Sequence, residues 1–80
     1  MNNLLQDGIY GVDSEGCLFW VYKKRLVYYK PFKIIPFTQL NMNTLSYGNI
    51  KIVKLVDNCY DFKCLERFLK NNCNIIYEVN

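Results

Sequence analysis

Residues 9–22 read IYGVDSEGCLFWVY, in which two apolar stretches flank a polar tetrapeptide. The tetrapeptide, Asp13-Ser14-Glu15-Gly16, places Asp first and Gly last, as β-turns favour. The stretch from Ile9 to Val12 has the length of a short strand, and Cys17 to Tyr22 is rich in the aromatic residues and valine that strands prefer. This part of the sequence predicts a β-hairpin.

Both faces of the second strand of this hairpin are apolar, because side chains alternate between the two faces of a strand. One face carries Cys17, Phe19 and Val21, and the other carries Leu18, Trp20 and Tyr22. A single helix covers only one face of a sheet. The other face must be covered by the loop around residues 31–43, by a second copy of the chain or by a partner, since monomers seldom leave a large apolar patch exposed.

Further strands are expected downstream. The apolar pattern resumes from Leu26 to Tyr29, after a basic break that contains no Gly, Asn or Pro. Such a break specifies a tight hairpin poorly, and a continuous bent strand is the alternative. Two prolines bracket residues 32–35, which predicts an edge strand or an extended loop. Residues 44–47 and 50–56, joined by Gly48-Asn49, predict a second hairpin with a type II′ turn.

One amphipathic helix is predicted from about Tyr60 to Asn71, with Asn58 or Asp61 as its N-cap. At helical spacing its apolar side chains share one face and its charged side chains share the opposite face. A final strand is expected from Ile75 to Val79. The predicted fold class is α+β: a single domain over residues 1–80 with a small antiparallel sheet of four to six strands, one C-terminal helix packed on one face, and the order β-β-(β)-(β)-β-β-α-β.

Charge is distributed unevenly along the chain, whose net charge is +3. Residues 1–22 carry three acids and no base, whereas residues 23–54 carry seven basic residues and no acid. A segment of one sign attracts an anionic partner. A solvated basic face that binds nothing is the simpler interpretation.

The start of the chain lacks the basic and apolar regions of a signal peptide. The longest apolar run, Cys17 to Tyr22, has six residues, whereas a membrane helix needs about 18. We therefore expect a cytoplasmic protein, in the host cytoplasm if a phage encodes it, with reduced thiols and no membrane partner. The cysteines, at positions 17, 59, 64 and 73, include no Cys-x-x-Cys pair, so they are interpreted as small core residues and not as a zinc site.

Catalysis is not expected from this composition. The chain has no histidine, which is the most common general acid–base group. Its carboxylate pairs, Asp13 with Glu15 and Asp57 with Asp61, have structural explanations in a turn and at a helix start. Its four glycines match no phosphate-binding loop. The sequence therefore predicts a protein that is not an enzyme and that has no cofactor or metal site.

The candidate contact surface lies between residues 20 and 33. Residues 22–33 hold five basic residues, four aromatic residues and no acid. Basic side chains bind phosphates and aromatic rings stack on unpaired nucleobases, whereas Trp, Tyr and Arg are also enriched at the hot spots of protein interfaces. The predicted partner-binding residues are Trp20, Tyr22, Lys23, Lys24, Arg25, Tyr29, Lys30 and Lys33.

Three functions fit these features. The first is a small protein-binding module that acts as an inhibitor or adaptor. The many asparagines, lysines and isoleucines of the chain indicate AT-rich coding. Such coding fits a phage or mobile element, and therefore an anti-defence protein such as an anti-CRISPR. The second is an RNA- or single-stranded-DNA-binding domain that uses residues 22–33, for which we expect steep salt dependence. The third is a homo-oligomeric structural subunit, such as a homodimer, whose second sheet face is buried between copies.

Overall fold

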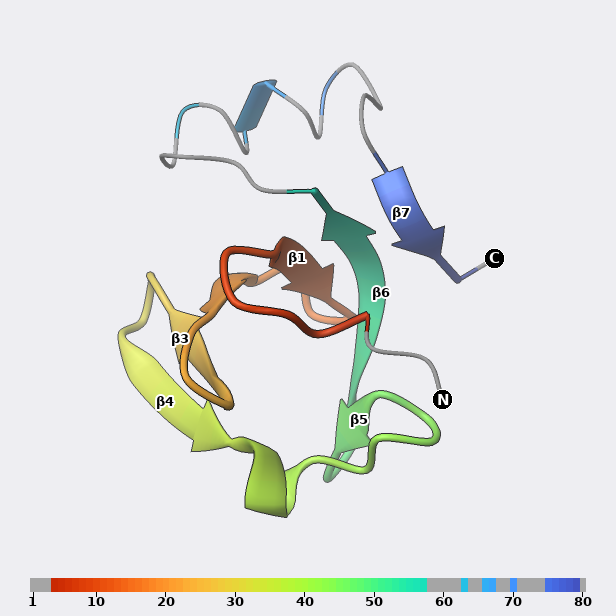
Figure 1. Cartoon of the computed structure of the whole chain (residues 1–80). Coiled ribbons are helices and arrows are strands. Elements are labelled where there is room, and N and C mark those ends of the chain that lie inside the picture. Colours follow the sequence, from red (N-terminus) through yellow and green to blue (C-terminus); the bar gives the residue numbers. More distant parts are fainter. Residues whose placement is uncertain (1–3, 58–62, 64–65, 68–69, 71–74, 80) are drawn as a thin grey trace.

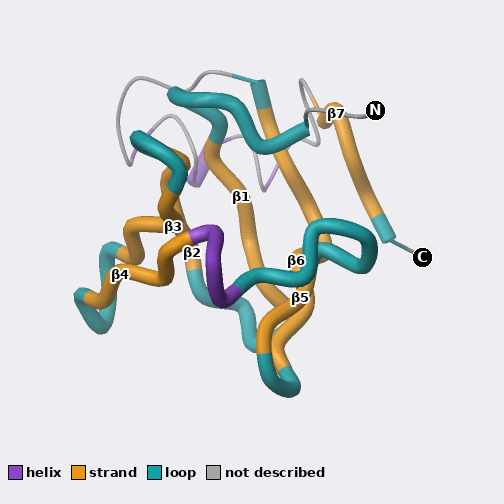
Figure 2. Tube along the Cα trace, turned by 60° about the horizontal axis from the view of Figure 1, so that its bottom comes forward, coloured by secondary structure: helices purple, strands orange, loops and turns teal. Residues whose placement is uncertain are grey.

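The computed structural model describes residues 4–57, 63, 66, 67, 70 and 75–79 (Figure 1). Its elements are β1 Tyr10–Asp13, β2 Leu18–Val21, β3 Arg25–Tyr28, β4 Lys33–Pro36, the 3-10 helix η1 Phe37–Gln39, β5 Ser46–Tyr47, β6 Ile50–Val56 and β7 Ile75–Glu78. The strands form an antiparallel sheet in the order β4-β3-β2-β1-β6-β5, and β7 pairs with the C-terminal part of β6. The sheet curls into a half-barrel, and η1 leads from β4 back towards β5 (Figure 2).

The α+β fold class predicted from the sequence is wrong. In the described residues the fold is an antiparallel half-barrel of seven strands, and its elements include no α-helix. Of the stretch from about Tyr60 to Asn71, for which the sequence predicts a helix, only Lys63, Glu66, Arg67 and Lys70 are described. These four positions are helical, and the rest of the stretch lies outside the described residues. The prediction assumes a flat sheet that needs a helix to cover one face. A curled sheet instead encloses a core on its concave side with its own strands and loops.

The two hairpins and the edge strand predicted from the sequence are confirmed. β1 and β2 pair around the predicted turn, in which the Asp13 carboxylate accepts hydrogen bonds from the backbone N–H groups of Glu15 and Cys17. β5 and β6 form the second hairpin, with Gly48 at φ +55, as the first central position of a type II′ turn requires. β4 lies at the edge of the sheet, and β7 is the predicted final strand.

The basic break between β2 and β3 is a tight two-residue hairpin and not a bend in a continuous strand. The backbone groups of Tyr22 and Arg25 hydrogen-bond in both directions, with N···O distances of 3.0 and 3.1 Å. Lys23 and Lys24 both have positive φ, +47° and +61°, as a type I′ turn requires. The backbone N–H of Lys23 also donates to Asp7 Oδ1 at 2.9 Å. The sequence conceals this turn because Asn and Gly usually occupy its two central positions.

The close packing of the curled sheet depends on Gly11 of β1. A Cβ atom at this position would lie 2.6 Å from Phe19 Cζ on β2 and 2.6 Å from the carbonyl oxygen of Lys54 on β6. The Phe19 ring therefore packs directly over the backbone of β1, where any larger residue would displace it. A shift of register between β1 and β6 adds a bulge beside this contact, and bulges bend the strands that carry them.

Gly11→Ala is expected to lower the free energy of unfolding by about 1–3 kcal/mol, because overpacking forces neighbouring groups to move. Urea denaturation measures the loss. Gly16→Asn is the matched control: nothing lies within 4 Å of a Cβ at Gly16, and asparagine tolerates its φ of +82°. If both variants lost the same stability, the close approach over Gly11 would not explain the requirement for glycine there.

The hydrophobic core fills the concave side of the half-barrel. Its central members come from β2, β3 and β6 and are Phe19, Val21, Leu26, Tyr28, Ile52 and Leu55. Leu40 and Leu45, from the segment between η1 and β5, pack on the same core, as do Leu5 and Ile9 from the lead-in to β1. The loop after β4 therefore covers the inner face of the sheet and not the outer face that carries Trp20.

A buried hydrogen-bond network joins the first turn to this core. The Tyr28 hydroxyl donates to Asp13 Oδ2 at 2.8 Å and also hydrogen-bonds to the hydroxyl of Tyr47. Burial, reinforced by the hydrogen bonds to Tyr47 and Asp13, raises the pKa of Tyr28, and burial also raises the pKa of Tyr47. The network connects β1, β3 and β5 through the interior of the half-barrel.

The raised pKa values of Tyr28 and Tyr47 predict a loss of stability at alkaline pH. Both phenols ionise above the ordinary value of 10.0 in the folded chain, so the unfolded chain releases these protons first. Their contribution to stability is complete below pH 10.0 and is lost as the pH rises further. Above that pH, unfolding free energies from urea titrations should fall more steeply for the wild type than for Tyr28→Phe. Parallel pH curves would contradict this assignment.

Candidate binding groove

The outer face of the sheet carries a row of apolar side chains across four strands. Tyr10 pairs with Trp20, Trp20 pairs with Val27, and Val27 pairs with Ile34. Directly paired residues on neighbouring antiparallel strands point to the same face of a sheet. These four side chains therefore lie side by side on the face opposite the core.

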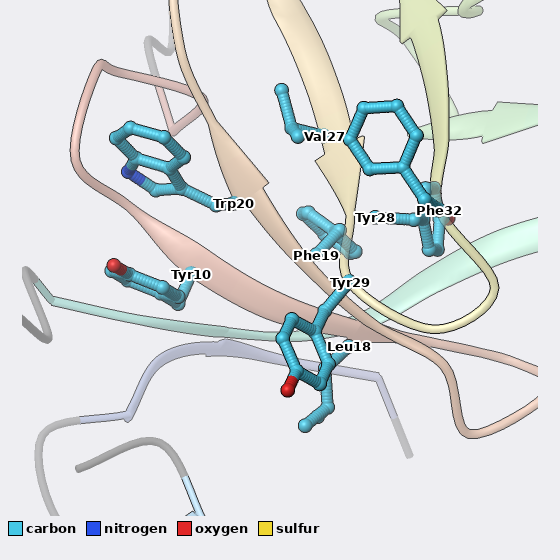
Figure 3. Close-up of a pocket in the computed structure, with 8 residues that line it drawn as sticks. All are labelled: Tyr10, Leu18, Phe19, Trp20, Val27, Tyr28, Tyr29 and Phe32. Carbon is cyan, nitrogen blue, oxygen red and sulfur yellow. The ribbon is translucent and has the colours of Figure 1, made fainter. Parts of the chain in front are cut away.

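This face is hollowed into a groove of about 460 Å³ (Figure 3). Its lining comes from β1, β2, β3 and the turn after β3 and consists of Tyr10, Leu18, Phe19, Trp20, Val27, Tyr28, Tyr29 and Phe32. The Trp20 and Tyr10 rings lie along one side of the groove and the Phe32 ring along the other, with Val27 between Trp20 and Phe32 (Figure 3). No charged side chain is among these described lining residues, so the groove offers apolar and aromatic contacts.

Three rings of the outer face stack on one another. The centroids of Trp20 and Tyr22 lie 4.9 Å apart with their planes at 19°, and those of Trp20 and Tyr10 lie 6.1 Å apart at 21°. The Trp20 indole thus stacks on two aromatic neighbours, which hold its orientation. A side chain that is oriented in advance loses less conformational entropy on binding.

The rim of the groove is open to solvent. The side chains of Phe32, Tyr29 and Ile34 are 72, 62 and 47% exposed, and that of Tyr22 is 38% exposed. Isolated exposed apolar residues are common, but these four adjoin one groove. Contiguous apolar patches of this kind mark sites of interaction on soluble proteins.

Basic side chains stand at the two ends of the groove. Lys23, Lys24 and Arg25 occupy the β2–β3 turn and the start of β3, and Lys23 Nζ lies 5.2 Å from the centroid of the Tyr22 ring. Lys30 lies in the turn after β3, at the other end of that strand. Basic residues therefore lie beyond both ends of the apolar lining, together with Asp7 beside Lys23 at the first end and Glu15, just before the Gly16 that shares a hollow with Lys30, at the second.

The β2–β3 turn retains lysines at positions where their backbone is strained. A residue with a Cβ atom in the left-handed region costs about 1–2 kcal/mol, and both Lys23 and Lys24 adopt that region. Lys24→Gly is therefore expected to raise the free energy of unfolding in urea by about 1 kcal/mol. Lys51→Gly, at an exposed position of β6, is the control and should destabilise the fold, as glycine does within strands. A less stable Lys24→Gly variant would refute the assignment of strain.

The structure gathers most of the residues that the sequence predicts as partner contacts. Trp20, Tyr22 and Tyr29 lie in or beside the groove, and Lys23, Lys24, Arg25 and Lys30 lie in or next to the two turns that bound β3. Lys33 lies apart from them. It pairs with Tyr28, and its Nζ lies 4.7 Å from the centroid of that core-facing ring.

Four contributors to the outer face are missing from the predicted partner-binding residues: Tyr10, Val27, Phe32 and Ile34. Alternation along a strand shows which residues share a face but not which face is inside, so Tyr10 and Ile34 are placed only by their pairing partners. Phe32 reaches the groove through the turn after β3, in which the Lys30–Pro31 peptide bond is cis. In the sequence, only the neighbouring Pro31 points to the role of Phe32. A proline there indicates a turn, but it does not show to which face of the sheet the Phe32 side chain points.

In the described part of the chain, no three Cys, Asp or Glu side chains gather as a metal ion would require. Cys17 has a free thiol, and Cys59, Cys64 and Cys73 lie outside the described residues. Within the described segments no helix is long and apolar enough to cross a membrane.

Comparisons with protein-family models, with curated proteins and with solved structures found no match. The groove itself has four features that bear on function: an apolar lining, a stacked indole ring, an exposed aromatic rim and basic residues in the adjoining turns.

Proposed function

We propose that this chain is a non-catalytic binding module that recognises a protein partner through the groove on the outer face of β1–β3. The observation that carries the proposal is an open groove of about 460 Å³ walled by aromatic rings, which the loop after β4 does not cover. A module of this kind acts by occupying a surface of its partner, as an inhibitor or an adaptor does.

The residue types of the groove support a protein partner. Trp20 lies centrally between other rings, and Trp, Tyr and Arg are the side chains most enriched at interface hot spots. Apolar centres with a polar rim are the usual anatomy of protein interfaces. Here the apolar lining forms the centre, and Lys23, Lys24 and Lys30 belong to the rim.

Single-stranded nucleic acid fits this groove less well. Proteins that bind it line a groove with basic residues along the backbone path and leave aromatic faces free for stacking. In the described lining there is no basic residue, and Tyr10 and Tyr22 flank the indole of Trp20. Lys33 is on the inner face, and Lys54 forms an ion pair with Glu78 at 3.3 Å.

A second copy of the chain is also a poorer occupant. The two ends of the groove carry basic residues, and the described lining contains no carboxylate. Two copies packed face to face would bring the basic ends of one copy close to those of the other. Juxtaposed like charges oppose association.

The test is affinity capture from the cells that produce the chain, after nuclease treatment. Wild type is expected to retain a protein in a fixed stoichiometric ratio, and Phe32→Ser, which removes the most exposed ring of the rim, is expected to lose it. Met42→Ser is the matched control, because Met42 is 45% exposed but belongs to the loop between η1 and β5. A complex that nuclease abolishes, or that survives Phe32→Ser unchanged, would refute the proposal.

A further inference from the structure

We infer that the groove binds an extended acidic segment of the partner, with one aromatic side chain of that segment seated between Trp20 and Phe32. This inference rests on the proposed function and specifies its ligand. It combines three observations: the shape of the groove, the rings that wall it and the charge at its ends.

The shape of the groove suits one large side chain. Its volume of about 460 Å³ lies in the lower half of the range for pockets that hold small ligands, about 300–1,000 Å³. Val27 and Leu18 contribute apolar lining, and Trp20 and Phe32 face each other across Val27 (Figure 3). Rings prefer offset-stacked or edge-to-face partners. The Phe32 ring, which is 72% exposed, offers its face to an incoming ring, and Trp20, which already stacks on Tyr10 and Tyr22, offers an edge.

The charge at the two ends selects the residues that flank this anchor. Arg25 and Lys30 lie five positions apart along β3 and the following turn, which spans at most about 16 Å. An extended segment that follows β3 across this length places residues two or three positions before and after its anchor next to the basic ends. Asp7 lies at the first end, where its Oδ1 accepts the backbone N–H of Lys23, and Glu15 lies near Lys30 at the second end, so the excess of positive charge is largest at the first end, which holds Lys23, Lys24 and Arg25. Acidic residues at both flanks of the segment complement the groove.

The strained turn supports the same conclusion. Lys23 and Lys24 stay in the left-handed region, although Asn and Gly fit these positions without strain. Strained residues that persist in a fold mark positions with a functional requirement. At this turn the requirement is for two ammonium groups at the end of the groove, which Asn and Gly lack.

Trp20 is the chain's single tryptophan, so its fluorescence reports directly on the groove. The probe is the synthetic peptide Asp-Glu-Ser-Phe-Ser-Glu-Asp, blocked at both ends and free of tryptophan. Two matched peptides replace the four acids by lysine or the phenylalanine by alanine. The full chain is titrated with each peptide, and the emission of Trp20 gives the dissociation constants.

The acidic phenylalanine peptide is expected to bind at least tenfold more tightly than either matched peptide and to lose most of that advantage in Lys23→Glu/Lys24→Glu. Added salt should weaken it, because exposed charges are screened. Equal binding of the acidic and lysine peptides, or no binding of any peptide, would overturn the inference. So would tighter binding of an oligothymidine of equal length, or a dimer in sedimentation that excludes the peptide. The capture experiment separates this inference from the proposed function. If the peptides fail but wild type still captures a protein that Phe32→Ser does not, the inference is wrong and the proposed function stands.

Discussion

Trp20→Ala is expected to raise the dissociation constant of the partner complex by about 30-fold or more, since central aromatic anchors contribute about 2 kcal/mol or more to binding. The indole lies between Tyr10 and Tyr22 and forms one wall of the groove, so its removal opens the groove and also releases its two neighbours. Isothermal titration calorimetry with the captured partner measures the change. The core lies on the opposite face of the sheet, so the variant should still fold.

Two further variants separate the role of Trp20 in binding from a role in folding. Phe32→Ser changes a side chain that is 72% exposed, so it should weaken the complex and leave the unfolding midpoint unchanged. Ile76→Ala removes an apolar side chain that is 43% exposed on β7, away from the groove, and should leave both unchanged. If Trp20→Ala weakened binding only in proportion to unfolded protein while Phe32→Ser had no effect, the groove would not be the contact surface.

Asp13→Ala is expected to cost about 3 kcal/mol of unfolding free energy, because it removes the side-chain acceptor of two backbone N–H groups in the turn and the charged acceptor of the buried Tyr28 hydroxyl. Asp13 Oδ1 accepts the backbone N–H groups of Glu15 and Cys17, and its Oδ2 accepts the Tyr28 hydroxyl at 2.8 Å. A domain of this kind has only about 5–15 kcal/mol of stability in total. The variant is therefore expected to unfold at much lower urea concentration than the wild type.

The conservative variant divides this effect into its two parts. Asp13→Asn keeps an oxygen for the turn but replaces the acceptor of Tyr28 by an amide donor, so about half of the loss should remain. Glu15→Ala, at an exposed position of the same turn, is the control and should change the stability by less than about 0.5 kcal/mol. If Asp13→Ala and Glu15→Ala gave the same small loss, the buried network would not stabilise the fold.

Local signals in the sequence predicted the strands well. Asp13 and Gly16 mark the first turn and Gly48 marks the second, and each has the conformation or hydrogen bonds that its residue type favours. The sequence leaves the β2–β3 hairpin open beside a bent continuous strand, because Lys23 and Lys24 occupy turn positions at which Asn or Gly is the usual signal. Turn signals are local, so a turn built from atypical residues escapes them.

The shape of the sheet could not be predicted, because it depends on contacts between residues distant in sequence. Gly11 allows the Phe19 ring to pack over β1, and Lys54 brings β6 against the same point. A glycine in a strand indicates a close approach without showing what approaches. Without the curvature of the sheet, a helix is the simplest element to cover one apolar face, and the α+β fold class predicted on that basis is wrong.

The candidate site was predictable in part. The strict alternation of β2 placed Trp20 and Tyr22 on one face, and the structure brings both beside the groove. Lys33 belongs to the same basic stretch of sequence but faces the core side, because its pairing with Tyr28 fixes its direction. Composition identified the segment, and the register of the sheet decided which of its side chains meet.

The most direct test of the binding groove uses the single tryptophan as a label. With 5-fluorotryptophan incorporated, the chain gives one fluorine resonance, from Trp20, and this resonance is followed while the captured partner is added. A contact at the groove predicts a new resonance of the bound state that grows in proportion to the partner and is absent with the Phe32→Ser variant. A resonance that keeps its shift while the partner binds elsewhere on the chain would contradict the account.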